Sequence, residues 1–148
     1  MEIREILENI EDRELPLIKE DETIKGVLRK MIHNPHARLI YVIDKKHVYK
    51  GVISLDILIK HLFPYCFEPP VIPRSLIPMI TAKTARDIMN KGLVYATNED
   101  TVDEVIDRMI RAGINEIAIL DDEKRVIADL TMLDLLKHCH LNKNDIDE

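Results

Sequence analysis

The chain has 148 residues, which is enough for one compact domain or for two small halves that share a core. Its net charge is -6, and its few aromatics are four tyrosines and two phenylalanines, which argues against nucleic-acid binding. No apolar run approaches the roughly 20 residues that span a bilayer, and the N-terminus lacks the features of a signal peptide. We therefore expect a cytoplasmic protein without membrane insertion.

Apolar residues at helical spacing predict two helices near the N-terminus. Residues 2–10 form a short amphipathic helix that needs a surface to lie on. Residues 23–33 form a longer helix, because its apolar side chains recur at every third or fourth position. Pro35 ends this helix.

Two apolar, β-branched runs predict strands over residues 39–43 and 47–53. A polar turn that begins at Asp44 joins them. The second strand closes at Ser54, and residues 55–62 then show another helical face.

The middle of the chain differs in composition. Five of the seven prolines fall in residues 63–83, at positions 64, 69, 70, 73 and 78. This predicts a stiff connector, and its many apolar residues indicate that it packs on a surface.

A second series of elements begins at Thr84, which with Asp87 forms a capping-box pattern for a short helix. Residues 93–96 predict a short leading strand. A longer helix follows from Thr101 to a glycine cap at Gly113.

The second half of the chain repeats the first. The longer helices align at an offset of 78 residues, and after one deletion the strands and closing helices align at an offset of 77. The repeat predicts strands over 115–120 and 125–130 and a helix after Thr131, which matches Ser54. Two copies of one unit indicate a pseudo-twofold pair.

The order strand, helix, strand, strand, helix, repeated in tandem, resembles a pair of cystathionine-β-synthase (CBS) domains, or Bateman module. The motifs that carry the resemblance are Gly51-Val-Ile-Ser54, Ala128-Asp-Leu-Thr131-Met-Leu-Asp134, Asp87-Ile-Met89, Thr101-Val-Asp-Glu-Val105 and Tyr41-Val-Ile-Asp44. The resemblance implies an α+β (α/β) fold of two β-α-β-β-α motifs around a pseudo-twofold axis. The motifs would span residues 1–62 and 84–140, with the connector at 63–83 and a flexible tail at 141–148.

The resemblance also implies a ligand site in the cleft between the motifs. Family members often bind AMP, ADP, ATP or S-adenosylmethionine there. Asp134 would accept the ribose hydroxyls and Thr131 would lie near phosphate. The adenine side would be formed, largely by backbone, by Val94, Tyr95, Ala96, Asn115, Glu116 and Ile117.

The first repeat departs from this pattern at its equivalent turn. Its aspartate is Asp56, one residue early, and Ile57 takes the position that matches Asp134. One helical residue corresponds to a rotation of about 100°, so Asp56 points elsewhere. Ser54 is a weaker candidate, and we expect one good ligand site per chain.

A simpler interpretation stands beside this one. Thr131 followed three residues later by an acid is also an ordinary N-terminal cap, worth about 1 kcal/mol to a helix. The scattered histidines do not have the spacing of a metal site, and no catalytic constellation occurs, so we expect neither a metal nor an enzyme. The acids Glu99, Asp100, Asp103, Glu104 and Asp107 are more typical of a solvated helix face than of a weak Mg²⁺ site.

Two functions follow from the sequence. The first is a stand-alone regulatory CBS pair that binds an adenine nucleotide or adenosyl ligand and acts on an unknown partner. The alternative is a ligand-free interaction module, or a weak Mg²⁺ sensor. In either case the resemblance implies a disc-like homodimer.

Overall fold

The computed structural model describes residues 1–10, 12–34, 38–63 and 82–140, with the side chains of residues 139 and 140 left out. Its contacts divide the chain into two compact units. Unit 1 contains Met1–Leu15 and Val94–Glu148, and unit 2 contains Pro16–Leu93. The predicted connector at 63–83 and the predicted tail at 141–148 lie almost entirely outside the described residues.

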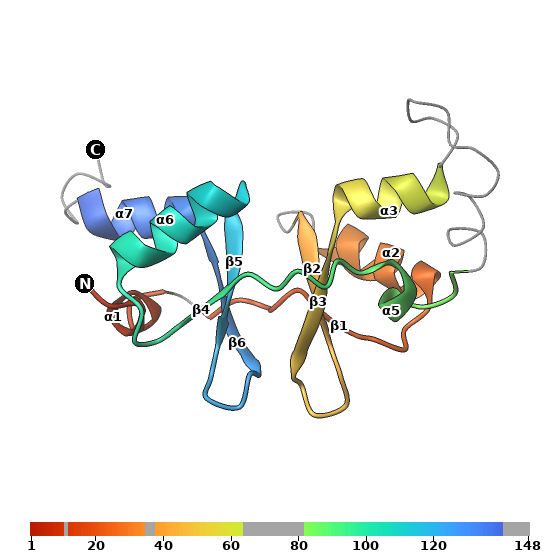
Figure 1. The fold of residues 1–148 in the computed structure, drawn as a ribbon, viewed down its shortest axis with the longest axis horizontal. Coiled ribbons are helices and arrows are strands. Elements are labelled where there is room, and N and C mark those ends of the chain that lie inside the picture. Colours follow the sequence, from red (N-terminus) through yellow and green to blue (C-terminus); the bar gives the residue numbers. More distant parts are fainter. Residues whose placement is uncertain (11, 35–37, 64–81, 141–148) are drawn as a thin grey trace. The chain divides into compact units, whose positions relative to one another are not determined.

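Unit 2 is built on a three-stranded sheet of β1 (Leu17–Lys19), β2 (Leu39–Ile43) and β3 (Tyr49–Ser54). β1 runs parallel to β2, and β3 runs antiparallel to it. Three helices complete the unit (Figure 1): α2 (Ile24–His33), α3 (Leu55–Leu62) and α5 (Ala85–Ile88). Their buried side chains form one core with the sheet: Ile18, Val27, Met31, Ile40, Val42, Ile53, Leu58 and Ala85.

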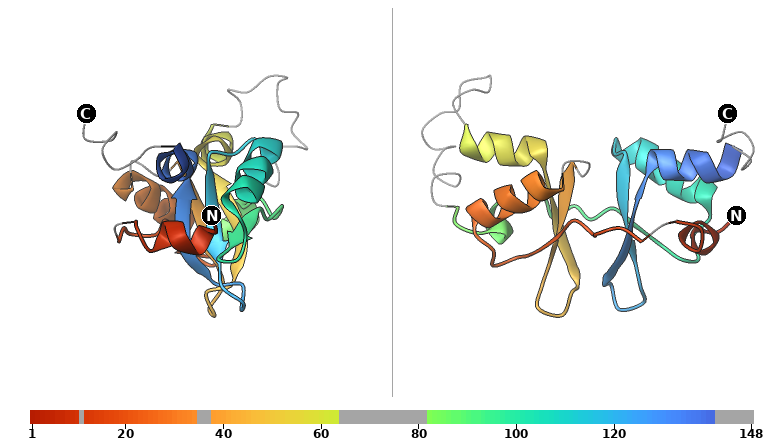
Figure 2. Two further views of the ribbon diagram at one scale, coloured as in Figure 1. Left: turned by 90° about the vertical axis from the view of Figure 1, so that its left-hand side faces the viewer. Right: turned by 180° about the vertical axis from the view of Figure 1, so that it is seen from behind.

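Unit 1 repeats this plan with β4 (Tyr95–Thr97), β5 (Glu116–Leu120) and β6 (Val126–Thr131) in the same order and directions. Helices α6 (Val102–Ala112) and α7 (Met132–His140) cover one face of the sheet (Figure 2), and α1 (Ile3–Leu7) packs on the same core. That core contains Ile3, Ile6, Ala96, Val102, Val105, Met109, Ile117, Ile119, Leu130 and Leu135.

The short helix at the start of each repeat packs in the unit formed by the other repeat. Glu2, before α1, pairs with Thr101 before α6, and Thr84, before α5, pairs with Thr23 before α2. The N–H of Ile3 donates to the carbonyl of Asp100 at 2.9 Å. The compact units therefore differ from a division at the repeat boundaries 1–62 and 84–140.

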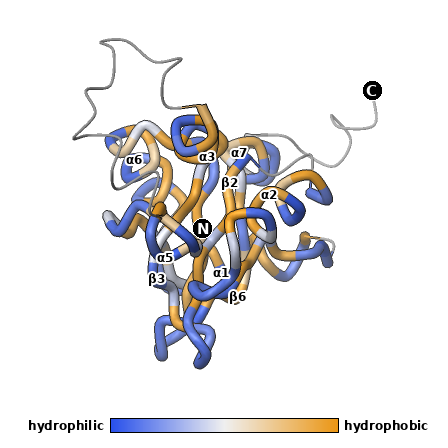
Figure 3. The backbone as a smooth tube through the Cα atoms, turned by 90° about the vertical axis from the view of Figure 1, so that its right-hand side faces the viewer, coloured by the Kyte–Doolittle hydropathy of each residue, from blue (hydrophilic) through white to orange (hydrophobic). Residues whose placement is uncertain are grey.

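The hairpins confirm the offset of 77 residues between the repeats. His47 and Lys124 have φ values of 65° and 66°, and their positions differ by 124 − 47 = 77. The Oδ1 atom of Asp44 accepts from the second and fourth residues beyond it, and Asp121 does the same. These turns are hydrophilic (Figure 3), as expected for exposed hairpin ends.

The predicted elements are confirmed, with changes at their ends. The N-terminal helix covers only Ile3–Leu7, and the leading strand of the second repeat is Tyr95–Thr97 rather than residues 93–96. Thr84 and Asp87 form the predicted capping box, and Gly113 ends α6 in the left-handed conformation at φ 66°.

Candidate nucleotide site

The candidate residues of the second repeat gather at one end of the sheet in unit 1. Glu116 and Thr131 are directly paired residues of β5 and β6, and Tyr95 begins the strand on the other side of β5. The N–H of Met132 donates to the carbonyl of Asn115 at 2.8 Å, which joins the start of α7 to the start of β5. Three separate stretches of sequence therefore meet where α7 begins.

Thr131 and Asp134 form two reciprocal hydrogen bonds at this point. The N–H of Asp134 donates to Oγ1 of Thr131 at 3.1 Å, and the N–H of Thr131 donates to Oδ2 of Asp134 at 2.8 Å. This is the reciprocal arrangement of a capping box, so the capping interpretation of the motif is correct. It also fixes the carboxylate at the end of the sheet.

Arg13 is a third member of this cluster that the sequence motifs do not reveal. Its Nη2 donates to Oδ2 of Asp134 at 2.6 Å and to the backbone carbonyl of Asp129 at 2.5 Å. The Arg13 side chain is 41% exposed and that of Asp134 is 20% exposed. The ion pair therefore lies at the surface of unit 1, and Asp134 is the more buried of its two partners.

Asp134 is ionised at neutral pH. Burial alone raises the pKa of its carboxyl, but the hydrogen bonds from Arg13 and Thr131 outweigh this and lower the pKa below its ordinary value. Arg13 and the N–H of Thr131 both donate to Oδ2 of Asp134, and the third contact uses the backbone N–H of Asp134. Within the described part of the chain, Oδ1 of Asp134 accepts no hydrogen bond. An ionised carboxylate can accept about four hydrogen bonds, so this one retains acceptor capacity.

Two more carboxylates surround Arg13. Leu130 lies in the core, so its neighbours Asp129 and Thr131 lie on the opposite face of β6, and Glu116 is paired with Thr131 on that same face. Burial alone lowers the pKa of Arg13, but Asp134, Asp129 and Glu116 raise it above its ordinary value. One guanidinium therefore faces three acids.

The first repeat lacks this cluster. By the offset of 77, Glu116, Asp129 and Asp134 correspond to three aliphatic residues, Leu39, Val52 and Ile57. The strand pairing agrees, because Leu39 pairs with Ser54 as Glu116 pairs with Thr131.

Ser54 caps α3 and has no acid opposite it. Its Oγ accepts from the N–H of Ile57 at 3.2 Å, as Thr131 accepts from Asp134. This confirms that Ile57 is the counterpart of Asp134. Asp56 is exposed and one residue out of register.

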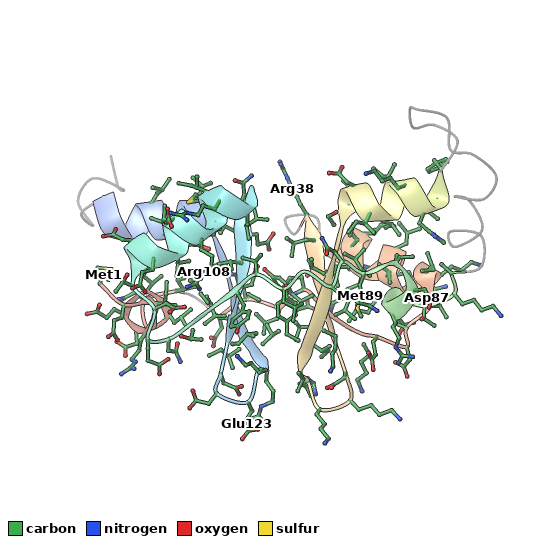
Figure 4. All side chains as sticks on the ribbon, viewed as in Figure 1. Met1, Arg38, Asp87, Met89, Arg108 and Glu123 are labelled. Carbon is green, nitrogen blue, oxygen red and sulfur yellow. The ribbon has the colours of Figure 1, made fainter. Side chains whose placement is uncertain are left out.

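The adenine-side candidates offer mainly backbone. Ala96 and Ile117 are buried in the core, at 0% and 1% exposed, and Val94 packs against it. The carbonyl of Tyr95 accepts from Nη1 of Arg108 at 2.6 Å (Arg108 is labelled in Figure 4). The Tyr95 hydroxyl contacts Nζ of Lys124 at 2.9 Å, in the hairpin next to the labelled Glu123, so this side chain points away from Thr131.

Most of the acidic helix face is already paired. Asp100 accepts from Arg108 at 3.0 Å, Asp107 from Arg111 at 2.9 Å, and Glu104 caps its own helix. Among the residues that the structure describes, no group of three His, Cys, Asp or Glu side chains is placed to hold a metal ion.

The comparisons with known proteins agree with this architecture. The CBS domain family model matches residues 3–64 and 85–141, so the chain belongs to the CBS domain family. CBS domain pairs are generally regulatory modules rather than enzymes. No curated protein sequence matches the chain. Within the described ranges, no helix is long and apolar enough to cross a membrane.

Three solved structures are similar. A CBS domain-containing protein from Thermotoga maritima has a TM-score of 0.73 and 25% identity, over 93% of each chain. The cytosolic domain of the Mg²⁺ channel MgtE, solved with ATP, has a TM-score of 0.63 and 26% identity, over 84% of this chain and 44% of that one. The CBS domain pair of protein MJ0100, solved with 5′-methylthioadenosine and S-adenosyl-L-methionine, has a TM-score of 0.68 and 17% identity, over 93% and 94%.

Sequence reasoning missed Arg13 and Asp129. Arg13 is one charge among several in Glu11-Asp12-Arg13-Glu14, and nothing in its spacing marks it. Asp129 could have been found, because the aligned repeats place an acid there opposite Val52.

Proposed function

We propose that this chain is a regulatory CBS pair that binds an adenine nucleotide or adenosyl ligand, such as AMP, ADP, ATP or S-adenosylmethionine, at Thr131 and Asp134. The observation that carries the proposal is the ionised carboxylate of Asp134, which is fixed by its capping box and keeps Oδ1 unpaired among the described residues. Such a group accepts hydrogen bonds from both hydroxyls of a ribose.

The sheet end around Asp134 supports this use. The start of α7 supplies the positive end of a helix dipole, and the candidate positions Asn115 and Glu116 lie beside it. The aliphatic residues at the equivalent turn of unit 2 support one ligand per chain. The similarity to a module solved with ATP supports an adenine ligand.

Thermal melting with AMP, ADP, ATP and S-adenosylmethionine tests the proposal. A ligand at 100 times its dissociation constant should stabilise the protein by about 2.7 kcal/mol. Asp134→Ala should abolish this gain. Asp87→Ala is the matched control, because Asp87 is also the acid of a capping box and accepts from Lys83 and Thr84 at 2.9 and 3.0 Å, but in unit 2.

The results separate the possibilities. A stabilisation that Asp87→Ala keeps and Asp134→Ala loses supports the site. A stabilisation that survives Asp134→Ala contradicts it. No stabilisation by any of the four ligands would favour the alternative function.

The alternative is an interaction module that forms homodimers through its helices. It is favoured by large exposed apolar side chains on α6 and α7, where Ile110 is 67% and Leu133 is 76% exposed. Sedimentation of Ile110→Glu tests it, with the exposed neighbour Arg111→Glu as control. A dimer that only Ile110→Glu dissociates supports the helical contact, and a monomeric wild type contradicts it.

A further inference from the structure

We propose that Arg13 is an internal competitor for the nucleoside: its guanidinium occupies the ribose-accepting carboxylate of Asp134, and an adenosyl ligand binds by displacing it. This inference rests on the proposed function. Under this inference Arg13 lowers the affinity for the adenosyl ligand, and ligand binding changes the contacts of Arg13.

The contact with Arg13 and the binding of a ribose would use the same carboxylate oxygen, Oδ2 of Asp134. Arg13 donates to Oδ2 of Asp134 at 2.6 Å, and that oxygen also accepts from the N–H of Thr131. A ribose presents two neighbouring hydroxyls, and one carboxylate takes them best through both of its oxygens. Oδ1 is available for one hydroxyl, but Arg13 stands on the side of Oδ2. The second hydroxyl and the guanidinium therefore compete.

Asp134 does not need Arg13 for its position. The capping box with Thr131 holds the carboxylate from the start of α7. Loss of Arg13 therefore leaves the acceptor in place and increases its free capacity. A residue that merely supported the site would leave the carboxylate misplaced when removed, so the two roles predict opposite changes in affinity.

Arg13 keeps other interactions when it leaves Asp134. Its second hydrogen bond, at 2.5 Å, ends on the backbone carbonyl of Asp129, and the charges of Asp129 and Glu116 also stabilise the guanidinium. Displacement from Asp134 therefore costs one ion pair and leaves Arg13 close to two acids. The pair is partly exposed, which limits its strength.

Displacement has a consequence for the backbone. Along the sequence, Arg13 comes after α1, which belongs to unit 1, and before β1, which belongs to unit 2. Its contacts with Asp129 and Asp134 attach this crossing segment to unit 1. Ligand binding that releases Arg13 from Asp134 loosens the attachment, and by reciprocity an event that loosens the segment increases ligand affinity.

The test measures adenosine binding to the full chain by calorimetry. Adenosine is uncharged, so the result does not depend on long-range attraction between arginine and phosphate. We expect Arg13→Ala to bind adenosine about fivefold more tightly, because a partly exposed ion pair is weak. Arg86→Ala is the control, since it removes an arginine paired with Glu20 at 3.1 Å in unit 2 and should leave affinity unchanged.

A second ligand locates the competition. 2′,3′-Dideoxyadenosine lacks both hydroxyls, so Arg13→Ala should not improve its binding. Equal or weaker adenosine binding by Arg13→Ala overturns the inference while the proposed function stands. The same improvement for both ligands also overturns it. If wild type, Arg13→Ala and Arg86→Ala all fail to bind any adenosyl compound, the proposed function itself is wrong.

Discussion

Replacing Ile6 by alanine tests whether the N-terminal helix is part of the core of unit 1. Ile6 is 0% exposed and lies in one cluster with Val105, Met109 and Leu135. Replacing a buried isoleucine by alanine costs about 2–5 kcal/mol, through lost burial and the cavity left behind. We expect about 3 kcal/mol, because α1 has only five residues and can shift to fill part of the cavity.

Urea unfolding followed by circular dichroism measures this change in the free energy of unfolding. Ile110→Ala is the control, because Ile110 is in the same unit but is 67% exposed, and its replacement should cost less than about 0.5 kcal/mol. A cost for Ile6→Ala as small as that of the control would refute the packing of α1 on unit 1. The measurement at low protein concentration avoids a contribution from association.

Two further predictions concern unit 1. Gly113→Ala should destabilise the protein by about 1 kcal/mol in urea, because Gly113 has φ 66° and alanine tolerates this conformation poorly; an unchanged midpoint would contradict this. Asp134→Asn should lose stability at neutral pH and match the wild type in acid. The folded-state pKa of Asp134 is lowered, so its contribution is fully present above the unfolded-state value and is lost as the pH falls through the lowered folded-state pKa. A stability gap that does not shrink as the pH falls below the unfolded-state value would show that the charge is not its cause.

The repeated elements could be predicted because each carries its own local signal. The helices have apolar residues at every third or fourth position, and Thr23, Ser54, Thr84 and Thr101 lie at their N-termini as expected. The register of the first turn was also predictable. The repeats align at an offset of 77 residues beyond this turn, and this alignment places Ile57 at the position equivalent to Asp134.

The exchange of the short helices could not be predicted. Ile3 and Ile6 show that the N-terminal helix must bury one face, but both repeats offer a similar sheet and helix surface. Only the tertiary structure decides between them. The same limit applies to Arg13, because its contact with Asp134 joins residues that are 121 positions apart.

Placing an acid at Ile57 tests whether one carboxylate is sufficient to make a site. The N–H of Ile57 already donates to Ser54, so Ile57→Asp would complete a capping box and gain up to about 1 kcal/mol. It would also lose a partly buried side chain that packs on the core of unit 2, at a cost of about 1–2 kcal/mol. The variant should therefore fold with slightly lower stability.

We expect Ile57→Asp to bind one adenosine per chain, as the wild type does under the proposed function. The reason is that the strand residues near its turn remain Leu39 and Val52, whereas those near the turn of Asp134 are Glu116 and Asp129. Calorimetric stoichiometry measures this, with Asp56→Ala as a control that should change nothing. Two ligands per chain would show that the aspartate alone separates the two turns, and that the surrounding charges contribute little to the site.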